Sequence, residues 1–294
     1  MENQATRNKG IDIINKVKES LYNNKQCIAA YTLGSYSHDK VWQWSDLQIS
    51  VILDDDYKGK CYYDLYEQDI RLALNVYTLS QFKAFISTVR VEDFIWKAFS
   101  KSTKLFSKDP MLDELMEEAF YIGDVTRQQE MLLGFSGAVY YLNKCEKNLY
   151  VKENIENVLY FLPQLAEHIA WIEIFKNKKV PERELIPQGK LLNPTLFAKI
   201  YDPLFNEKVD FAIIKSIIDH CISYLEENTT LVYEPILNYL EKHGSLDHFH
   251  YETRPFGFGI NYEWLVRCGI TQRHGTPEKV PFLKQAEKLS YHLS

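Results

Sequence analysis

The sequence predicts an α+β protein, in which a mixed-sheet domain is followed by an all-helical domain and a small tail of helices and a hairpin. Three observations lead to this prediction. In the first third of the chain, apolar residues recur at every second position, as in strands. From about Met111 to Leu225 they recur every three or four positions, as in helices. The pattern changes again near residue 231, so we expect domains at 1–110, 111–230 and 231–294.

The first domain is expected to begin with an amphipathic helix and a short apolar strand, Cys27 to Leu33. The apolar positions of the helix, at helical spacing, are Ile11, Ile14, Val17 and Leu21. Gly34 and Ser35 follow the strand as a turn, where a backbone without a Cβ can come close to an anion.

A second strand is expected after a spacer of about ten residues, with Ser45 and Asp46 at its entry. The segment from Asp46 to Leu53 alternates, so Asp46, Gln48 and Ser50 share one face of the strand. Its apolar positions, Leu47, Ile49 and Val51, share the other.

The combination of turn, spacer and strand resembles the nucleotidyltransferase superfamily that includes DNA polymerase beta and the aminoglycoside and lincosamide nucleotidyltransferases. The resemblance implies a nucleotidyltransferase-like mixed-sheet domain, in which Gly34, Ser35 and Ser45 bind the nucleotide. It also implies that two acids, two positions apart on the strand, hold magnesium against a nucleoside triphosphate. Asp46 matches the first acid, but Gln48 stands at the second.

The family's third carboxylate lies on a neighbouring strand, for which Ile70 to Thr78 is the candidate. Asn75 aligns with that acid, so an amide again replaces a carboxylate. Asp69 is a substitute if the register differs, and Asp39 or the run Asp54-Asp55-Asp56 could also restore metal binding. A solvated turn is the alternative interpretation of that acidic run.

An amide keeps the shape of a carboxylate without its charge, so it coordinates a metal weakly and cannot act as a base. With amides at two of three expected carboxylates, the leading hypothesis is a degenerate relative that binds a nucleotide or a partner and acts in regulation. The alternative is an active nucleotidyltransferase that transfers a nucleoside monophosphate to a small-molecule hydroxyl. In that case Asp46 is catalytic, and Asp46, Gln48 and Asn75 are the metal ligands.

A strand at Lys104 to Phe106 and an Asp109-Pro110 helix start are expected to close the first domain. The second domain is predicted to contain long helices at Met131 to Leu142, Ile155 to Phe175 and Phe211 to Leu225. In small-molecule nucleotidyltransferases such a domain forms the acceptor half of the cleft. The candidates for an acceptor-activating group are Glu167, His168 and Glu173. A histidine on an apolar helix is more often a core residue than a catalyst.

The last segment is expected to form helices at Leu231 to His243 and Tyr262 to Cys268, then a hairpin from Ile270 to Leu283, then a final helix. This is winged-helix order. The tail resembles that of Bacillus-type nucleotidyltransferase-like proteins, in which a carboxy-terminal winged helix follows a helical domain. A DNA-binding regulator is therefore a further alternative. However, residues 231–294 carry seven Lys or Arg against seven Asp or Glu, which disfavours DNA binding.

The composition is typical of a globular protein in the cytoplasm, and the resemblance to Bacillus-type proteins implies a bacterial one. The net charge of −6 argues against nonspecific coating of nucleic acid. Five scattered cysteines without CxxC spacing fit reduced thiols. We expect no membrane segment. Because the chain is rich in aromatic residues, with 20 Tyr and 16 Phe, a homodimer or a protein partner is a reasonable expectation.

Overall fold

The structure is a computed structural model that describes residues 2–37, 41–91, 93–205, 208–247, 259–278, 280–282 and 286–294. The chain divides into two compact units, Met1–Tyr121 and Ile122–Ser294. The first unit thus includes the helix after residue 110, and no division occurs at residue 230, where a long helix continues. Within the described ranges, no helix is both long enough and apolar enough to cross a bilayer.

The first unit is built on a five-stranded mixed sheet in the order β3-β4-β2-β1-β5. Its strands are β1 (Cys27–Leu33), β2 (Leu47–Leu53), β3 (Tyr62–Glu67), β4 (Ile70–Thr78) and β5 (Thr103–Ser107). β1 is antiparallel to both β2 and β5, β2 is parallel to β4, and β3 is antiparallel to β4. The expected α+β class is confirmed, and β3 is an addition to the expected strands.

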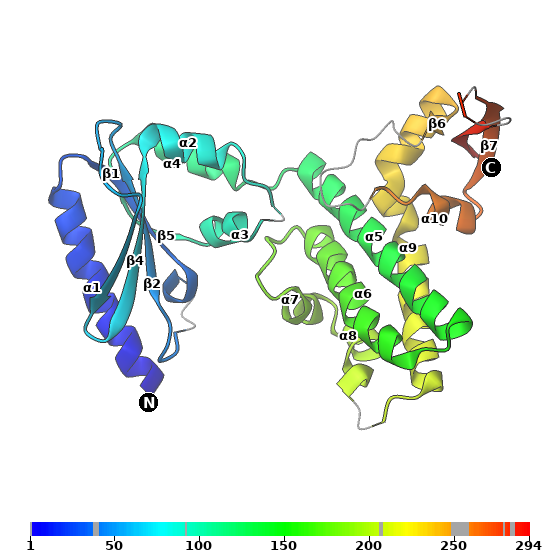
Figure 1. Ribbon diagram of the computed structural model, residues 1–294, viewed down its shortest axis with the longest axis horizontal. Coiled ribbons are helices and arrows are strands. Elements are labelled where there is room, and N and C mark those ends of the chain that lie inside the picture. The colour runs from blue at the N-terminus through cyan, green and yellow to red at the C-terminus, as the bar shows by residue number, and fades with distance from the viewer. Residues whose placement is uncertain are drawn as a thin grey trace. The chain divides into compact units, whose positions relative to one another are not determined.

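Helices cover both faces of this sheet (Figure 1). Helix α1 (Glu2–Asn23) packs on one face, where Ile13 is buried against Leu47, Ile49 and Val51. The inward face of α1 includes Ile13, whereas Ile11 is 39% exposed, contrary to its expected place on that face. The other face packs against α2 (Leu79–Ile86), α3 (Phe94–Ser100) and α4 (Pro110–Ala119).

The starts of α2 and α4 follow directly from local sequence. The Thr78 hydroxyl accepts from the Gln81 N–H, and the Gln81 side chain accepts from the Thr78 N–H, which together form a capping box. In α4 the Asp109 carboxylate accepts from the Met111 N–H at 3.0 Å, and Pro110 occupies the first helical position.

The second unit is mainly helical. Its helical segments are α5 (Asp124–Glu146), η2 (Lys147–Val151), α6 (Ile155–Lys176), α7 (Leu185–Leu192), α8 (Pro194–Ile200), η3 (Asp202–Phe205) and α9 (Phe211–His243). α9 is one helix of 33 residues, not the expected two. The polar segment near its middle remains helical because Asn228 and Thr229 are buried and donate to the Tyr224 and Leu225 carbonyls. α9 ends at Gly244, whose φ of 78° is left-handed.

The carboxy-terminal part of this unit contains α10 (Tyr262–Arg267) and a three-stranded sheet in the order β6-β8-β7. The strands are β6 (Leu246–Asp247), β7 (Thr271–Pro277) and β8 (Glu287–Leu293). The prediction of a final helix is wrong, because residues Glu287–Leu293 form strand β8. Buried Tyr291 of β8 pairs with Arg273 and Leu246, so pairing on both sides favours a strand. Residues 279 and 283 of the expected hairpin, and residues 284 and 285 after it, lie outside the described residues.

Candidate functional site

The expected phosphate-binding turn lies at the start of β2. Leu33 is the Cα partner of Gln48, so the chain leaves β1 at Gly34 beside the point where β2 begins. Gly34 has a φ of 73°, a left-handed conformation that favours glycine. The turn continues as η1 (Gly34–Ser37), and the Ser37 hydroxyl donates to the Thr32 carbonyl at 2.7 Å.

Close packing fixes this turn against α1. The ring of Tyr36 lies so near Gly10 that a Cβ there would come within 2.0 Å of it, so this glycine permits the contact. The Tyr36 hydroxyl also donates to the Thr6 carbonyl at 3.4 Å. Burial raises the pKa of Tyr36, and the charge of Asp46 raises it further, which places this phenol near the expected metal ligand.

Asp46 and Gln48 interact directly. The Gln48 side-chain amide donates to Asp46 Oδ2 at 2.9 Å, and both side chains are partly buried. Ser45, just before them, is 7% exposed, and its Oγ accepts from the Trp42 N–H at 3.0 Å. The residue at the second acidic position therefore donates a hydrogen bond to the first acid, a role that a second carboxylate could not take without a proton.

The parallel pairing of β2 with β4 determines which residues lie beside Asp46 and Gln48. Gln48 is the Cα partner of Ala73, and Ser50 is the Cα partner of Asn75. Asn75 thus lies on the same face of the sheet as Gln48, as expected. It is, however, two positions further along β4 than Ala73, the residue opposite Gln48. The same alternation places Arg71, two residues before Ala73, on this face near Asp46.

Arg71 belongs to a small polar cluster on β3 and β4. Its Nε and Nη2 donate to the two carboxylate oxygens of Asp64 at 2.8 and 3.0 Å, and Nη2 also lies 3.2 Å from the Tyr62 hydroxyl. These hydrogen bonds lower the pKa of Asp64 and raise that of Arg71, to which Asp46 adds a smaller electrostatic contribution. A fixed cation therefore lies close to the carboxylate of Asp46, just before β2.

The acidic run after β2 lies at the opposite end of that strand from Asp46. Asp54 follows the last residue of β2, eight residues after Asp46, which corresponds to roughly 26 Å along an extended strand. Asp55 accepts from the Ser80 N–H and hydroxyl at 2.9 and 2.7 Å, and these hydrogen bonds lower its pKa. Asp69 lies in the β3–β4 turn, 3.5 Å from Lys9. Asp39 lies outside the described residues.

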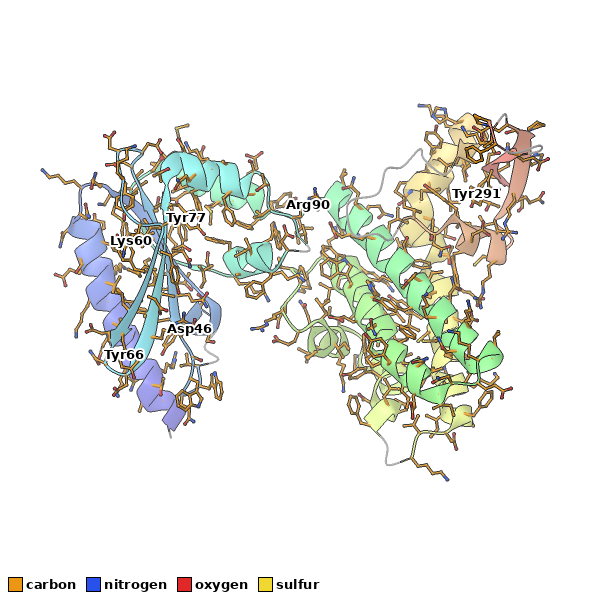
Figure 2. All side chains as sticks on the ribbon, viewed as in Figure 1. Asp46, Lys60, Tyr66, Tyr77, Arg90 and Tyr291 are labelled. Carbon is orange, nitrogen blue, oxygen red and sulfur yellow. The ribbon has the colours of Figure 1, made fainter. Side chains whose placement is uncertain are left out.

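Figure 2 shows the two ends of the sheet, with Asp46 and Tyr66 toward one end of the strands and Tyr77, the Cα partner of Ile52, toward the other. The described residues include no group of three or more His, Cys, Asp or Glu side chains able to hold a metal ion. Asp46 beside a donating amide and an arginine does not fit the paired carboxylates that magnesium requires in a two-metal site.

The three candidates on α6 of the second unit differ in environment. Glu167 is exposed. The ring of His168 stacks on Tyr141 with centroids 5.3 Å apart, and burial lowers the pKa of this histidine to about 4. Glu173 is 3% exposed, and its carboxylate accepts from Tyr224 at 2.8 Å, Lys176 at 3.2 Å and Asn193 at 3.3 Å. These contacts make Glu173 a link between helices.

Arg71, Asp64 and Tyr62 were not among the residues expected from sequence. For Arg71 a signal was present, since it continues the alternation of Ala73 and Asn75 by one step. The other two depend on β3, whose residues are exposed on both faces and so show no apolar period.

Comparison with solved structures finds a nucleotidyltransferase-like protein from Exiguobacterium sibiricum, with a TM-score of 0.59 and 13% identity, over 98% of this chain and 99% of that chain. The fold is nucleotidyltransferase-like. No family model matches the chain, and no curated protein gives a significant match. At this identity the likeness concerns the fold, and activity has to be argued from the site itself.

Proposed function

We propose that this nucleotidyltransferase-like protein has a degenerate metal site, and that it binds a nucleotide or a partner and acts in regulation. The main support is the hydrogen bond from the Gln48 amide to Asp46 Oδ2 at 2.9 Å. It uses one oxygen of Asp46, the residue just before β2, where a catalytic metal pair needs free, charged ligands. Ala73 opposite Gln48 and the nearby Arg71 add no acid.

Within the superfamily, the proposal places the chain nearest the Bacillus-type nucleotidyltransferase-like proteins, and treats α10 and the small sheet as a winged-helix-like tail. This placement is supported by the order of the parts and by the Glu263-Trp264-Leu265 segment. The proposed setting is the cytoplasm of a bacterium. The proposed ligand is a nucleoside triphosphate whose phosphates lie at the Gly34 and Ser35 turn.

The second candidate is an active nucleotidyltransferase. It is favoured by one observation, the position of Asp46 beside the Gly34 turn at the same end of β2. That candidate requires magnesium-dependent transfer of a nucleoside monophosphate, and this transfer should be lost in Asp46→Ala. A DNA-binding role has less support. Arg267, the cation of α10, donates to both carboxylate oxygens of Glu146 at 2.8 Å and lies over the Trp264 ring.

The test is calorimetric titration of ATP and of GTP, each with and without magnesium, into the wild type and Gln48→Asp. The proposal expects wild-type affinity that changes little with magnesium, and a magnesium-dependent gain in Gln48→Asp, where two carboxylates share one face. Wild-type binding that requires magnesium would favour the enzyme and make an acceptor screen worthwhile. If neither nucleotide binds with or without magnesium, ATP and GTP are excluded as ligands, and a partner remains as the proposed ligand.

A further inference from the structure

β3 forms an open edge of the sheet in the first unit. It is the terminal strand of the order β3-β4-β2-β1-β5, and among the described residues it pairs with β4 alone. The outer side of such a strand presents backbone N–H and C=O groups that can pair with another strand. Five of its six residues are exposed, so its side chains are also accessible.

The opposite edge has features that discourage pairing, and β3 lacks them. The β1–β5 pairing has a register shift between Ala30 and Tyr31, and β5 carries Lys104. The Tyr22 ring packs edge-on against Phe106, with centroids 5.4 Å apart. β3, in contrast, contains no Pro and no Lys, and its pairing with β4 runs without a shift from Tyr62 to Glu67. Proteins commonly protect edge strands with bulges, lysines or prolines.

The side chains of β3 resemble those of an interior strand. Tyr66 is 74% exposed, Leu65 45% and Tyr62 42%, although aromatic and branched residues usually pack against cross-strand neighbours. Asp64 is held by Arg71 of the neighbouring strand, so its charge is partly balanced within the sheet. The strand therefore combines unpaired backbone with apolar side chains that a further strand would cover.

We propose that β3 pairs antiparallel with β3 of a second copy of this chain, about a two-fold axis at Leu65, and so joins the two sheets into one. An axis perpendicular to the sheet keeps each face continuous, so residues on the same face must be partners. With Leu65 opposite its own copy, Asp64 lies opposite Tyr66 and Tyr63 opposite Glu67. Like charges therefore do not face each other anywhere along the strand.

The charges disfavour one neighbouring register and fit a second copy of the chain as the occupant. Moving the axis by one residue, to Asp64, would place two aspartates directly opposite each other, which is destabilising. In the Leu65 register, the Tyr66 hydroxyl of each copy lies beside Asp64 of the other, a donor next to an acceptor. The strand is thus complementary to itself. The inference does not depend on nucleotide binding, because the Asp46 site takes no part in the pairing.

Sedimentation velocity of the full chain tests the proposal. The wild type should sediment as a dimer, with twice the 34.6 kDa of one chain. Leu65→Lys places two lysines opposite each other on the axis and should give a monomer, while Leu65→Thr, which remains neutral and introduces a β-branched residue suited to strands, should remain a dimer. Far-ultraviolet circular dichroism and melting temperature establish that both variants are folded. A wild type that is monomeric at every concentration, or a folded Leu65→Lys that still dimerises, would overturn the proposal.

Cross-linking identifies the surface independently of stability. In a Cys61→Ser background, Leu65→Cys brings two thiols to the axis, where paired Cα atoms about 5 Å apart can form a disulfide. The matched control, Lys60→Cys in the same background, places its two thiols roughly 33 Å apart in an extended pairing. Mild oxidation should link only the Leu65→Cys chains. A dimer in which Leu65→Cys does not link, or Lys60→Cys links equally well, would contradict β3 pairing.

Discussion

His168 should make the protein less stable in mild acid. Burial lowers the pKa of this histidine from 6.5 to about 4 in the folded chain, so the unfolded chain takes up the proton more readily. The stability due to a neutral His168 is complete above the unfolded value and is lost as the pH falls from 6.5 toward 4. Linkage between these two pKa values lowers the free energy of unfolding by about 2 kcal/mol when the pH falls from about 7.5 to about 5.

The assay is urea unfolding followed by tryptophan fluorescence at both pH values, on the wild type and His168→Gln. The wild type should lose about 2 kcal/mol more than the variant between the two conditions. His243→Gln, at the exposed carboxy-terminal turn of α9, is the matched control and should follow the wild type. Equal losses in the wild type and His168→Gln would refute the reasoning, and would leave His168 open to a catalytic role at neutral pH.

Three further predictions concern single substitutions. Ser50→Ala should leave stability unchanged or raise it by about 1 kcal/mol in urea unfolding, because the fully buried Ser50 Oγ has no hydrogen-bond partner among the described residues. If Ser50→Ala instead lowers stability, the Ser50 hydroxyl has a hydrogen-bond partner and the prediction is wrong. Tyr224→Phe should cost about 2 kcal/mol, because it removes the 2.8 Å hydrogen bond to the Glu173 carboxylate; a loss within error would contradict this link between α6 and α9. Gly34→Ala should lower stability by about 1 kcal/mol, since its φ of 73° is strained for alanine although space for a Cβ is open. Gly34→Asn should cost less, and an unchanged melting temperature in Gly34→Ala would count against the left-handed turn.

Local alternation was enough to predict the central strands. In β2 the period of two separated Asp46 and Gln48 from Leu47 and Ile49, and the structure places them on opposite faces. The same reasoning could not find β3, because its exposed residues show no apolar period. Nor could it find β8, where Tyr291 is the single buried residue and pairing with distant strands decides the conformation.

The composition of the site was less predictable than its position. Alternation places Asn75 on the same face as Gln48, but only the parallel register shows that Ala73, not Asn75, lies opposite Gln48. That register depends on the packing of β2 against β4, whose paired residues, such as Gln48 and Ala73, are far apart in the chain. The alternation also placed Arg71 on this face, but only the register shows that it lies near Asp46.

Metal binding tests the central claim most directly. Titration of Mn²⁺ as a probe of the magnesium site, followed by electron paramagnetic resonance, would compare the wild type with Gln48→Asp and with Gln4→Asp. The latter adds the same charge on the exposed start of α1. The account predicts no specific site in the wild type or Gln4→Asp, and one bound ion in Gln48→Asp, where two carboxylates replace the amide–carboxylate pair. Equal, stoichiometric binding by the wild type and Gln48→Asp would contradict it.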